Sequence, residues 1–425
     1  MTGFSIDIDH NEYLSEGDTI VDAIVTVTSA GNGSGTVTAD AADFAQVIMV
    51  DCSGSMTGSR IAEAKRATIA AIESLDEGCR FAIVKGTDEA QMVYPDDETT
   101  AVVKSSTRSA AVKRVQILRA GGGTAMGTWL AKTSRILSGT DAAVKYGLLL
   151  TDGRNQHETE EELREHLDDC EGVFTCDACG IGEDWSATEV RHIADTLLGE
   201  ANGLPEPREW VERFTQLTNG ARAKTLADVN LRVFTPARNR IRFVKQMSPH
   251  ISDLTSRRRE LDDKTGDYPT GSWGAEAREF HISVEVPPIQ VGDDRLAARV
   301  SAMSGDTELI RHMVTARWTG DQMLSTRINP KVALHTGQAE LARAIQEGVA
   351  AARSGDTDTA TDRLGRAVAL AAEAGNDNTA RLLAKVVEVD PDTGTVQMKS
   401  AVSSVDLEMA DVESVKTVTV RKSSK

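Results

Sequence analysis

Between residues 44 and 225 the apolar positions alternate between two spacings. Short continuous apolar runs such as AQVIMV (45–50) are followed by segments such as RIAEAKRATIAAIESL (60–75), where apolar residues recur every three or four positions. A continuous apolar run is typical of a strand covered on both faces, and the second spacing is typical of an amphipathic helix. Strands that alternate with helices predict an α/β domain with a doubly wound, mostly parallel sheet.

The two flanks of this region contain strand patterns without helices between them. FSIDID (4–9) and TIVDAIVTVT (19–28) alternate between apolar and polar residues, and residues 226–335 are rich in similar runs. Two strands alone do not form a stable sheet. We therefore predict that residues 1–43 and 226–335 build one β-sandwich, with the α/β domain of residues 44–225 inserted into it. Within the second flank, the polar, Gly-containing stretch 257–274 is predicted to be a long exposed loop.

The C-terminal part is rich in alanine and has helical spacing. Residues 336–390 contain three such segments separated by Gly and Asp, which predicts a three-helix bundle. Residues 391–425 are predicted to form a tail with one or two strands. The stretch SGDTDTATD (354–362) has acidic residues at alternate positions, like a calcium loop, but it lacks the glycine and the late glutamate of such loops. A helix N-cap is the better interpretation.

Composition narrows the classes of function. The net charge of -18 argues against a nucleic-acid binder, because phosphate neutralisation needs clustered Lys and Arg. No apolar run approaches the roughly 20 residues of a membrane span, and the N-terminus lacks the pattern of a signal peptide. The five cysteines are an odd number in a long chain, which favours a reducing compartment, so we predict a cytoplasmic protein.

Two of the cysteines, Cys176 and Cys179, form a C-x-x-C motif. Cys170, His166 and His157 precede it and could complete a zinc site. However, the motif lies in a predicted strand, where an odd offset directs the two thiols to opposite faces. We therefore predict structural cysteines.

Oxygen-bearing side chains follow two of the predicted strands and one glycine-rich turn. DCSGSM places Asp51, Ser53 and Ser55 after AQVIMV, GGGT places Thr124 before a helix, and LLLTDG places Asp152 at another strand end. Ligands of doubly wound sheets bind at the carboxyl ends of the strands. Five oxygen ligands favour a hard cation, and Mg²⁺ fits best because it accepts few protein ligands and keeps waters. An N-cap cluster would explain the serines but not Thr124 and Asp152.

DCSGSM resembles the D-x-S-x-S signature of the von Willebrand factor type A family, and GGGT and LLTDG stand where that family has its remaining metal-site residues. The resemblance covers roughly residues 44–225. It implies a metal-ion-dependent adhesion site formed by Asp51, Ser53, Ser55, Thr124 and Asp152 that binds Mg²⁺ or Mn²⁺. It also implies a function in protein–protein interaction rather than catalysis.

Charge indicates how such a site would bind a partner. Only two of the five ligands are carboxylates, so a bound divalent ion would remain electrophilic at an open position and accept an Asp or Glu of a partner protein. One alternative is a metal-dependent hydrolase or phosphatase, which needs a general base that the motifs do not contain. Another is an assembly protein that binds through the sandwich and the helices. His157, five residues after Asp152, is predicted to be a solvated loop residue.

Overall fold

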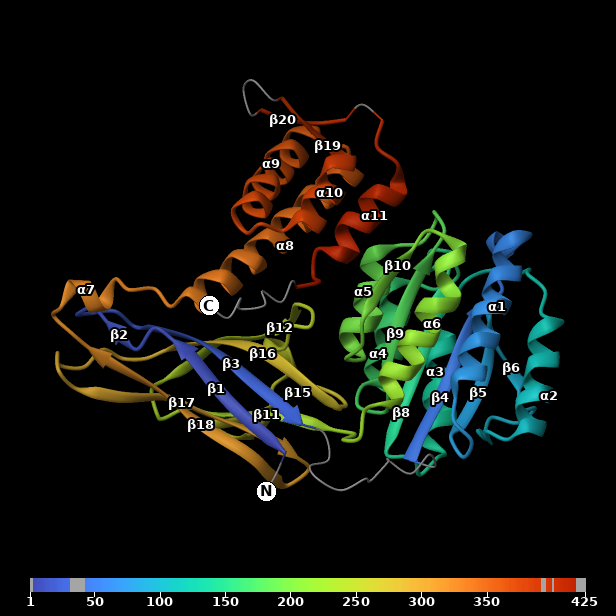
Figure 1. The fold of residues 1–425 in the computed structure, drawn as a ribbon, viewed down its shortest axis with the longest axis horizontal. Helices are drawn as coiled ribbons and strands as arrows, with labels where there is room; N and C mark the ends of the chain where they lie inside the picture. The colour runs from blue at the N-terminus through green and yellow to red at the C-terminus, as the bar shows by residue number, and fades with distance from the viewer. Residues whose placement is uncertain (1–2, 31–42, 391–394, 400, 418–425) are drawn as a thin grey trace, which may run out of the picture. The chain divides into compact units, whose positions relative to one another are not determined.

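The chain divides into two compact units. The computed structural model describes residues 3–30, 43–390, 395–399 and 401–417. One unit, here called the sandwich unit, comprises the chain up to Gly33, Asp228–Val402 and the residues from Glu413 onwards, and the other, the α/β unit, comprises Ser34–Ala227 and Ser403–Val412 (Figure 1). The chain therefore enters the α/β unit twice. The predicted boundary after residue 43 adjoins residues 31–42, which lie outside the described residues.

The α/β unit is built on a seven-stranded sheet. The strand order is β10-β9-β8-β4-β5-β6, and β7 also pairs with β5. Only β6 and β7 are antiparallel to their neighbour; the other strands are parallel, which confirms the predicted doubly wound, mostly parallel sheet. The strands are β4 (Phe44–Asp51), β5 (Arg80–Gly86), β6 (Ala90–Tyr94), β7 (Ala101–Val102), β8 (Val144–Thr151), β9 (Thr175–Ile181) and β10 (Ala201–Leu204).

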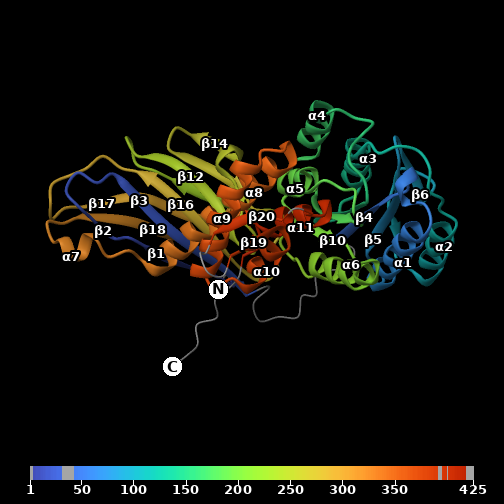
Figure 2. The same cartoon turned by 90° about the horizontal axis from the view of Figure 1, so that it is seen from above.

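Helices cover both faces of this sheet (Figures 1 and 2). Apolar side chains of α1, α2 and α6 pack on one face, and those of α3, α4 and α5 on the other. All eight residues of β4 are buried, which explains its continuous apolar run. The helices are α1 (Ser59–Ser74), α2 (Ser105–Gln116), α3 (Met126–Ser138), α4 (Glu160–Cys170), α5 (Ala187–Thr196) and α6 (Pro207–Arg222).

The C-x-x-C cysteines lie on opposite faces of the sheet. Cys176 packs with the α3–α5 layer and Cys179 with the α1, α2 and α6 layer. All five cysteines of the chain are buried and free. Burial raises the pKa of the Cys176 thiol well above its usual range, so this thiol resists the ionisation that metal binding needs. The two thiols therefore act as core side chains, as the strand position predicts.

The two large sheets of the sandwich unit are mainly antiparallel, and residues from both flanks of the insertion form each of them. In one sheet, with order β1-β3-β16-β12-β13, β3 pairs with β16 from Ala30 opposite Ala275 to Ile20 opposite Glu285. The other has the order β14-β15-β11-β17-β18-β2, and β2 joins β18 in parallel. The strands are β1 (Phe4–His10), β2 (Tyr13–Leu14), β3 (Ile20–Ala30), β11 (Val229–Phe234), β12 (Arg240–Ser248), β13 (Ser252–Asp253), β14 (Arg259–Asp262), β15 (Thr265–Pro269), β16 (Ala275–Glu285), β17 (Asp294–Ser304) and β18 (Thr307–Trp318).

Residues 257–274 do not form the predicted loop, although residues 259–264 are exposed, as predicted. Strands β14 and β15 form a hairpin there, and β15 pairs with β11. Asp262 stabilises the turn, because its Oδ1 accepts hydrogen bonds from the backbone N–H groups of Lys264 and Thr265 at 2.8 and 2.9 Å. Trp273 is only 1% exposed. A strand that is covered on one side only keeps many polar residues, so the composition of this segment resembles that of a loop.

The helical region begins earlier than the sequence suggests. Helix α8 (Pro330–Ser354) starts before the predicted boundary at residue 336, with Asn329 as N-cap and Pro330 in the first turn. It is followed by α9 (Thr357–Glu373) and α10 (Asp377–Val386), and a short helix, α7 (Gln322–Ser325), precedes it. Asp356 accepts a hydrogen bond from the backbone N–H of Thr359, which confirms the N-cap interpretation of the acidic stretch.

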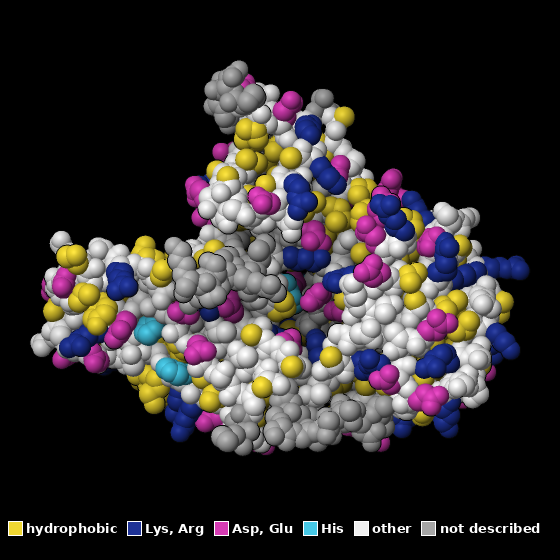
Figure 3. All heavy atoms as spheres, viewed as in Figure 1, with side chains coloured by type: hydrophobic (Ala, Val, Ile, Leu, Met, Phe, Trp, Pro, Cys, Tyr) yellow, Lys and Arg dark blue, Asp and Glu magenta, His cyan; other side chains and the backbone are white. Residues whose placement is uncertain are grey.

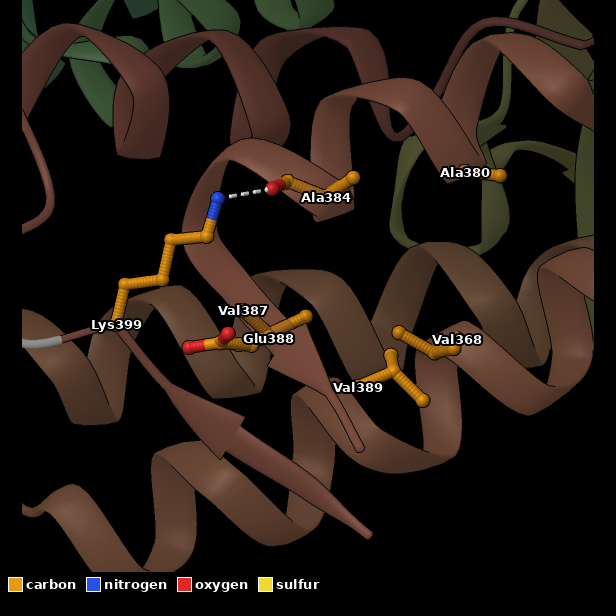
Figure 4. Close-up of a pocket in the computed structure, with 7 residues that line it drawn as sticks. All are labelled: Val368, Ala380, Ala384, Val387, Glu388, Val389 and Lys399. Carbon is orange, nitrogen blue, oxygen red and sulfur yellow. Dashed lines mark hydrogen bonds between the residues drawn. The ribbon is translucent and has the colours of Figure 1, made fainter. Parts of the chain in front are cut away.

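A small groove opens on this helical region (Figure 4). Its volume is about 340 Å³, and it lies beside the two-stranded sheet of β19 (Val387–Val389) and β20 (Val396–Met398). Lys399 closes one end, where its Nζ donates a hydrogen bond of 2.6 Å to the carbonyl of Ala384. The groove belongs to the sandwich unit and contains none of the predicted site residues.

The predicted tail of residues 391–425 contains a helix that belongs to the α/β unit. Helix α11 (Ser404–Glu413) buries Val412 in the α3–α5 layer. The carboxylate of Glu408 accepts a hydrogen bond of 2.7 Å from the backbone N–H of Ala187, at the start of α5. Asp411 forms an ion pair of 2.8 Å with Arg191. The sequence did not reveal this helix as part of the α/β unit, because its partners lie more than 200 positions away.

Glu279 connects α8 to the sheet that contains β16. Its carboxylate lies 2.8 Å from Nε2 of His335 and 2.6 Å from Nζ of Lys331. The hydrogen bond from His335, together with the one from Lys331, lowers the pKa of Glu279 to about 2. A carboxylate whose pKa is lower in the folded state stabilises that state above its unfolded pKa of about 4.3, and this contribution is lost as the pH falls to about 2.

We expect Glu279→Gln to destabilise the sandwich unit by about 1–3 kcal/mol at pH 7, because it removes a charge-assisted hydrogen bond. The difference from the parent should shrink between pH 4.3 and pH 2. Denaturant unfolding monitored by the fluorine resonances of 5-fluorotryptophan at Trp273 and Trp318 measures this unit alone. Glu285→Gln, on the same strand, removes only a surface ion pair with Arg240 and should change stability by less than about 0.5 kcal/mol. An equal effect of both variants at pH 7 would contradict the assignment.

Candidate metal-ion site

Asp51 is the last residue of the central strand β4, and its carboxylate is fully buried. Oδ1 accepts a hydrogen bond of 2.8 Å from the backbone N–H of Ser53. Oδ2 accepts one of 2.8 Å from the hydroxyl of Thr151 and a longer one of 3.3 Å from the backbone N–H of Asp152. Because β8 is paired with β4, the ends of both strands bring these residues together.

The two serines connect Asp51 to Asp152. The hydroxyl oxygens of Ser53 and Ser55 are 2.9 Å apart, and Ser55 donates a hydrogen bond of 2.6 Å to Oδ1 of Asp152. Ser53 is 2% exposed, whereas Ser55 is exposed to solvent. The chain of oxygens therefore runs from a buried carboxylate to the protein surface.

Thr124 reaches the same edge of the sheet from the loop between α2 and α3. Two backbone hydrogen bonds hold this loop against the DCSGS segment, from Gly121 to Cys52 at 2.7 Å and from Gly54 to Gly122 at 3.0 Å. An ideal Cβ on Gly153 would lie 3.3 Å from Oγ1 of Thr124 and 3.7 Å from Oγ of Ser55. The two hydroxyls thus converge beside Gly153, where a Cβ would be in close contact with both.

The segment after Asp152 fixes the start of α3. The N-cap residue of α3, Ala125, has no side chain that could accept a hydrogen bond. Instead, Asn155 accepts one of 3.0 Å from the backbone N–H of Met126, and Glu158 accepts one of 2.8 Å from that of Gly127. These contacts hold Thr124, directly before α3, against the segment that carries Asp152.

All five predicted site residues therefore lie at the carboxyl edge of the sheet. Within the described parts of the chain, no group of three or more His, Cys, Asp or Glu side chains is arranged to hold a metal. Hydroxyl oxygens would have to complete a metal site here, and Ser53, Ser55 and Thr124 are in place to do so. Oxygen donors with two carboxylates fit a hard divalent cation.

The carboxylates of this site are costly to bury as anions. Burial raises the pKa of Asp51 to about 6 and also raises the pKa of Asp152. The hydrogen bonds from Ser53 and Thr151 to Asp51 oppose this effect but do not cancel it. A cation between the two carboxylates would favour their charged forms, so the electrostatics of the site are consistent with cation binding.

Arg60 is a site residue that the motifs did not reveal. It is the second residue of α1, and its Nη1 lies 2.9 Å from Oδ2 of Asp152 and 3.4 Å from Oδ2 of Asp184. The only available signal was its position, directly after the D-x-S-x-S motif and at the start of the first helix. An arginine side chain has no oxygen that could bind a cation, so the prediction of oxygen ligands did not include it.

His157 has more contacts than a solvated loop residue. Its Nδ1 accepts a hydrogen bond of 3.2 Å from the backbone N–H of Thr124, and its own backbone N–H donates one of 3.0 Å to the carbonyl of Thr124. Its ring lies against Gly123, where a Cβ would overlap it. The side chain is exposed, as predicted, but it also holds the loop that carries Thr124.

The fold and the oxygen-rich edge of its sheet define a class, the doubly wound α/β domains with a D-x-S-x-S motif at the carboxyl end of a strand. Residues 45–202 match the von Willebrand factor type A domain, and residues 369–414 match the von Willebrand factor type A C-terminal domain. The chain belongs to the von Willebrand factor type A family. Domains of this family often mediate protein–protein interactions.

Two solved structures resemble the whole chain. The von Willebrand factor type A protein from Catenulispora acidiphila is 44% identical, with 99% of this chain and 98% of that one covered and a TM-score of 0.93. The ArnB paralog VWA2 from Sulfolobus acidocaldarius is 14% identical over 97% of this chain and 98% of that one, with a TM-score of 0.62, and shows likeness of fold alone.

A curated Synechocystis sp. protein, described as uncharacterised, is 26% identical over 213 residues. This match covers 49% of each chain, so the chain spans about half the length of that relative. The second family match, over residues 369–414, includes α11.

Proposed function

We propose that the chain is a cytoplasmic protein-binding module that holds Mg²⁺, or Mn²⁺, with Asp51, Ser53, Ser55, Thr124 and Asp152, and that the ion accepts an Asp or Glu side chain of a partner protein. The observation that carries this proposal is the convergence of these five oxygen-bearing side chains from three separate loops on one edge of the sheet. All five cysteines are free, and free cysteines are typical of a reducing compartment such as the cytoplasm.

The charges of the five residues support a carboxylate as the partner group. Asp51 and Asp152 are the only acids among them, and Asp152 is already paired with Arg60 at 2.9 Å. A divalent ion held by this set keeps part of its positive charge. Ser55, which is exposed, places the site where a partner can reach it. When bound, the ion would supply the electrophilic contact, and the residues of the chain would orient it.

A hydrolase or phosphatase is the alternative that uses the same oxygens, and the contacts of His157 argue against it. Its Nδ1 accepts a hydrogen bond from a backbone N–H, so the neutral ring carries its proton on Nε2. Neither nitrogen then offers a free lone pair to take a proton from water.

The remaining alternative is an assembly protein that binds through the sandwich or the helices. The groove beside β19 is the feature that would serve such a function. Basic and acidic side chains are interspersed on the face of the molecule that Figure 3 shows, so this face offers no continuous basic patch for a polyanion. Among the described residues, no helix is both long and apolar enough to cross a membrane.

We expect Thr124→Ala to weaken partner binding by about tenfold or more and Mg²⁺ binding by less, because the substitution removes a neutral ligand and leaves both carboxylates in place. The partner is first identified by capture with and without EDTA followed by mass spectrometry. Its affinity for the parent and for Thr124→Ala is then compared in saturating Mg²⁺ and in EDTA. Thr124→Ser retains the hydroxyl and should restore binding. Partner binding that is indifferent to EDTA and to Thr124→Ala would move the interface to the sandwich or the helices.

A further inference from the structure

Arg60 lies at the rim of the candidate metal site. We propose that Arg60 forms the second half of the carboxylate-recognition site: the metal binds one oxygen of the partner's Asp or Glu, and the guanidinium donates a hydrogen bond to the other. This proposal rests on the proposed function and adds to it the residue that selects a planar, two-oxygen anion. Arg60 touches the incoming group and is not a ligand of the ion.

The position of Arg60 is intermediate between the buried ligands and solvent. Its side chain is 28% exposed, whereas that of its partner Asp152 is fully buried and that of Asp184 is 69% exposed. Its Nη1 also lies 3.4 Å from the backbone carbonyl of Ser55. The guanidinium therefore lies next to the exposed Ser55, where the oxygen cluster reaches the surface.

The guanidinium retains donors for a further partner. All three of its hydrogen bonds, to Asp152, Asp184 and Ser55, use Nη1. Across the described residues, none accepts a hydrogen bond from its Nε or Nη2. An ideal Cβ on Gly182 would lie 3.5 Å from Nε and 3.8 Å from Nη2, so the guanidinium lies alongside a bare stretch of backbone. A planar guanidinium with unused donors is suited to binding a carboxylate. It can donate a hydrogen bond to one carboxylate oxygen while a neighbouring cation binds the other.

Arg60 should act on the metal and on the carboxylate in opposite directions. Its positive charge is paired with Asp152, so it competes with a divalent ion for that carboxylate and lowers the affinity for the ion. The same charge leaves a net charge of +1 among the buried Asp51 and Asp152, Arg60 and the ion, and the carboxylate of Asp184 offsets this only in part, because it is 69% exposed and lies 3.4 Å away. A carboxylate of the partner would neutralise this excess. A residue with a structural role only would not produce two effects of opposite sign.

The experiment uses the full chain, Mn²⁺ and ¹³C-labelled acetate as the probe. Titration followed by electron paramagnetic resonance gives the Mn²⁺ affinity, and broadening of the acetate resonance by bound Mn²⁺ gives the acetate affinity. For Arg60→Gln we expect Mn²⁺ to bind about three- to tenfold more tightly and acetate about tenfold more weakly. Arg60→Lys, which keeps the charge but loses the planar fork, should leave the Mn²⁺ affinity near that of the parent and recover only part of the acetate affinity.

The outcomes separate this proposal from the proposed function. A parent protein that does not bind Mn²⁺ overturns both. A parent that binds Mn²⁺ and acetate, with Arg60→Gln binding acetate equally well, overturns only the proposal, because Arg60 then merely neutralises Asp152. A parallel loss of both affinities in Arg60→Gln also overturns it, since that is the result of structural damage. Arg66→Gln, an exposed site on the same helix, is the matched control and should change neither affinity.

Discussion

Asp51→Asn is expected to lower the affinity for Mg²⁺ by more than about 100-fold, because it removes one of the two buried carboxylates of the site and, with it, several kcal/mol of Coulomb attraction. In the parent, Mg²⁺ at 100 times its dissociation constant should stabilise the fold by about 2.7 kcal/mol. The variant should show no such stabilisation. Isothermal titration measures the affinity, and thermal unfolding with and without Mg²⁺ measures the stabilisation.

The metal-free stability of Asp51→Asn should remain close to that of the parent. Burial raises the pKa of Asp51 to about 6, so removal of the charge relieves a cost of desolvation. The amide, in turn, has one acceptor oxygen where the carboxylate has two, and it leaves a donor of Ser53 or Thr151 without its partner. These two effects oppose each other. Asp141→Asn, in an exposed turn before β8, is the control that should leave both measurements unchanged. An Asp51→Asn variant that binds Mg²⁺ as well as the parent would exclude Asp51 as a ligand.

Glu408→Ala is expected to release α11 from the α/β unit. The substitution removes the hydrogen bond to the first backbone N–H of α5 and the ion pair of 3.7 Å with Arg154, at a cost of about 2–4 kcal/mol. Glu408 is 3% exposed, so solvent does not replace these contacts while the helix stays docked. Hydrogen exchange measured by mass spectrometry should then show faster exchange in residues 404–413 and at the start of α5.

Asp406→Asn provides the matched control for this prediction. Asp406 lies in the first turn of the same helix, where its carboxylate accepts a hydrogen bond of 2.7 Å from the Ser403 hydroxyl. Exchange in 404–413 should change little in this variant. Because Arg154 stands two residues after Asp152, a further comparison is informative: the Mg²⁺ affinity of Glu408→Ala reports whether docking of α11 also supports the metal site. Unchanged exchange in Glu408→Ala would show that Met409, Val412 and the ion pair of Asp411 with Arg191 hold the helix without Glu408.

The parts of the fold that depend on local patterns could be predicted from the sequence. The apolar run before Asp51 and the helical spacing after Arg60 identify a doubly wound sheet, because burial on both faces of a strand and on one face of a helix leaves different periods in the sequence. The five oxygen-bearing residues also stand at predictable places, since the ends of parallel strands meet at one edge of a sheet.

The hairpin at β14 and β15 and the early start of α8 were missed for local reasons. Strands covered on one side only carry many polar residues, and the turn at Asp262 resembles a loop in composition. The start of α8 had a signal in the sequence, Asn329 followed by Pro330, which is a typical helix N-terminus. These two residues precede the alanine-rich segment, whose composition marks only the later part of the helix.

Contacts between distant parts of the chain were decided only by the tertiary structure. The assignment of α11 to the α/β unit depends on Glu408 meeting the start of α5, and the role of Arg60 depends on Asp152, which lies 92 positions further along the chain. No periodicity or spacing in the sequence predicts such pairs. Arg60 and Glu408 each stand in a segment that looks like an ordinary surface helix. The sequence by itself therefore predicted the five oxygen-bearing side chains that the fold brings to one edge of the sheet. Only the fold determined that an arginine shares their carboxylate and that a C-terminal helix packs beside the loop that carries it.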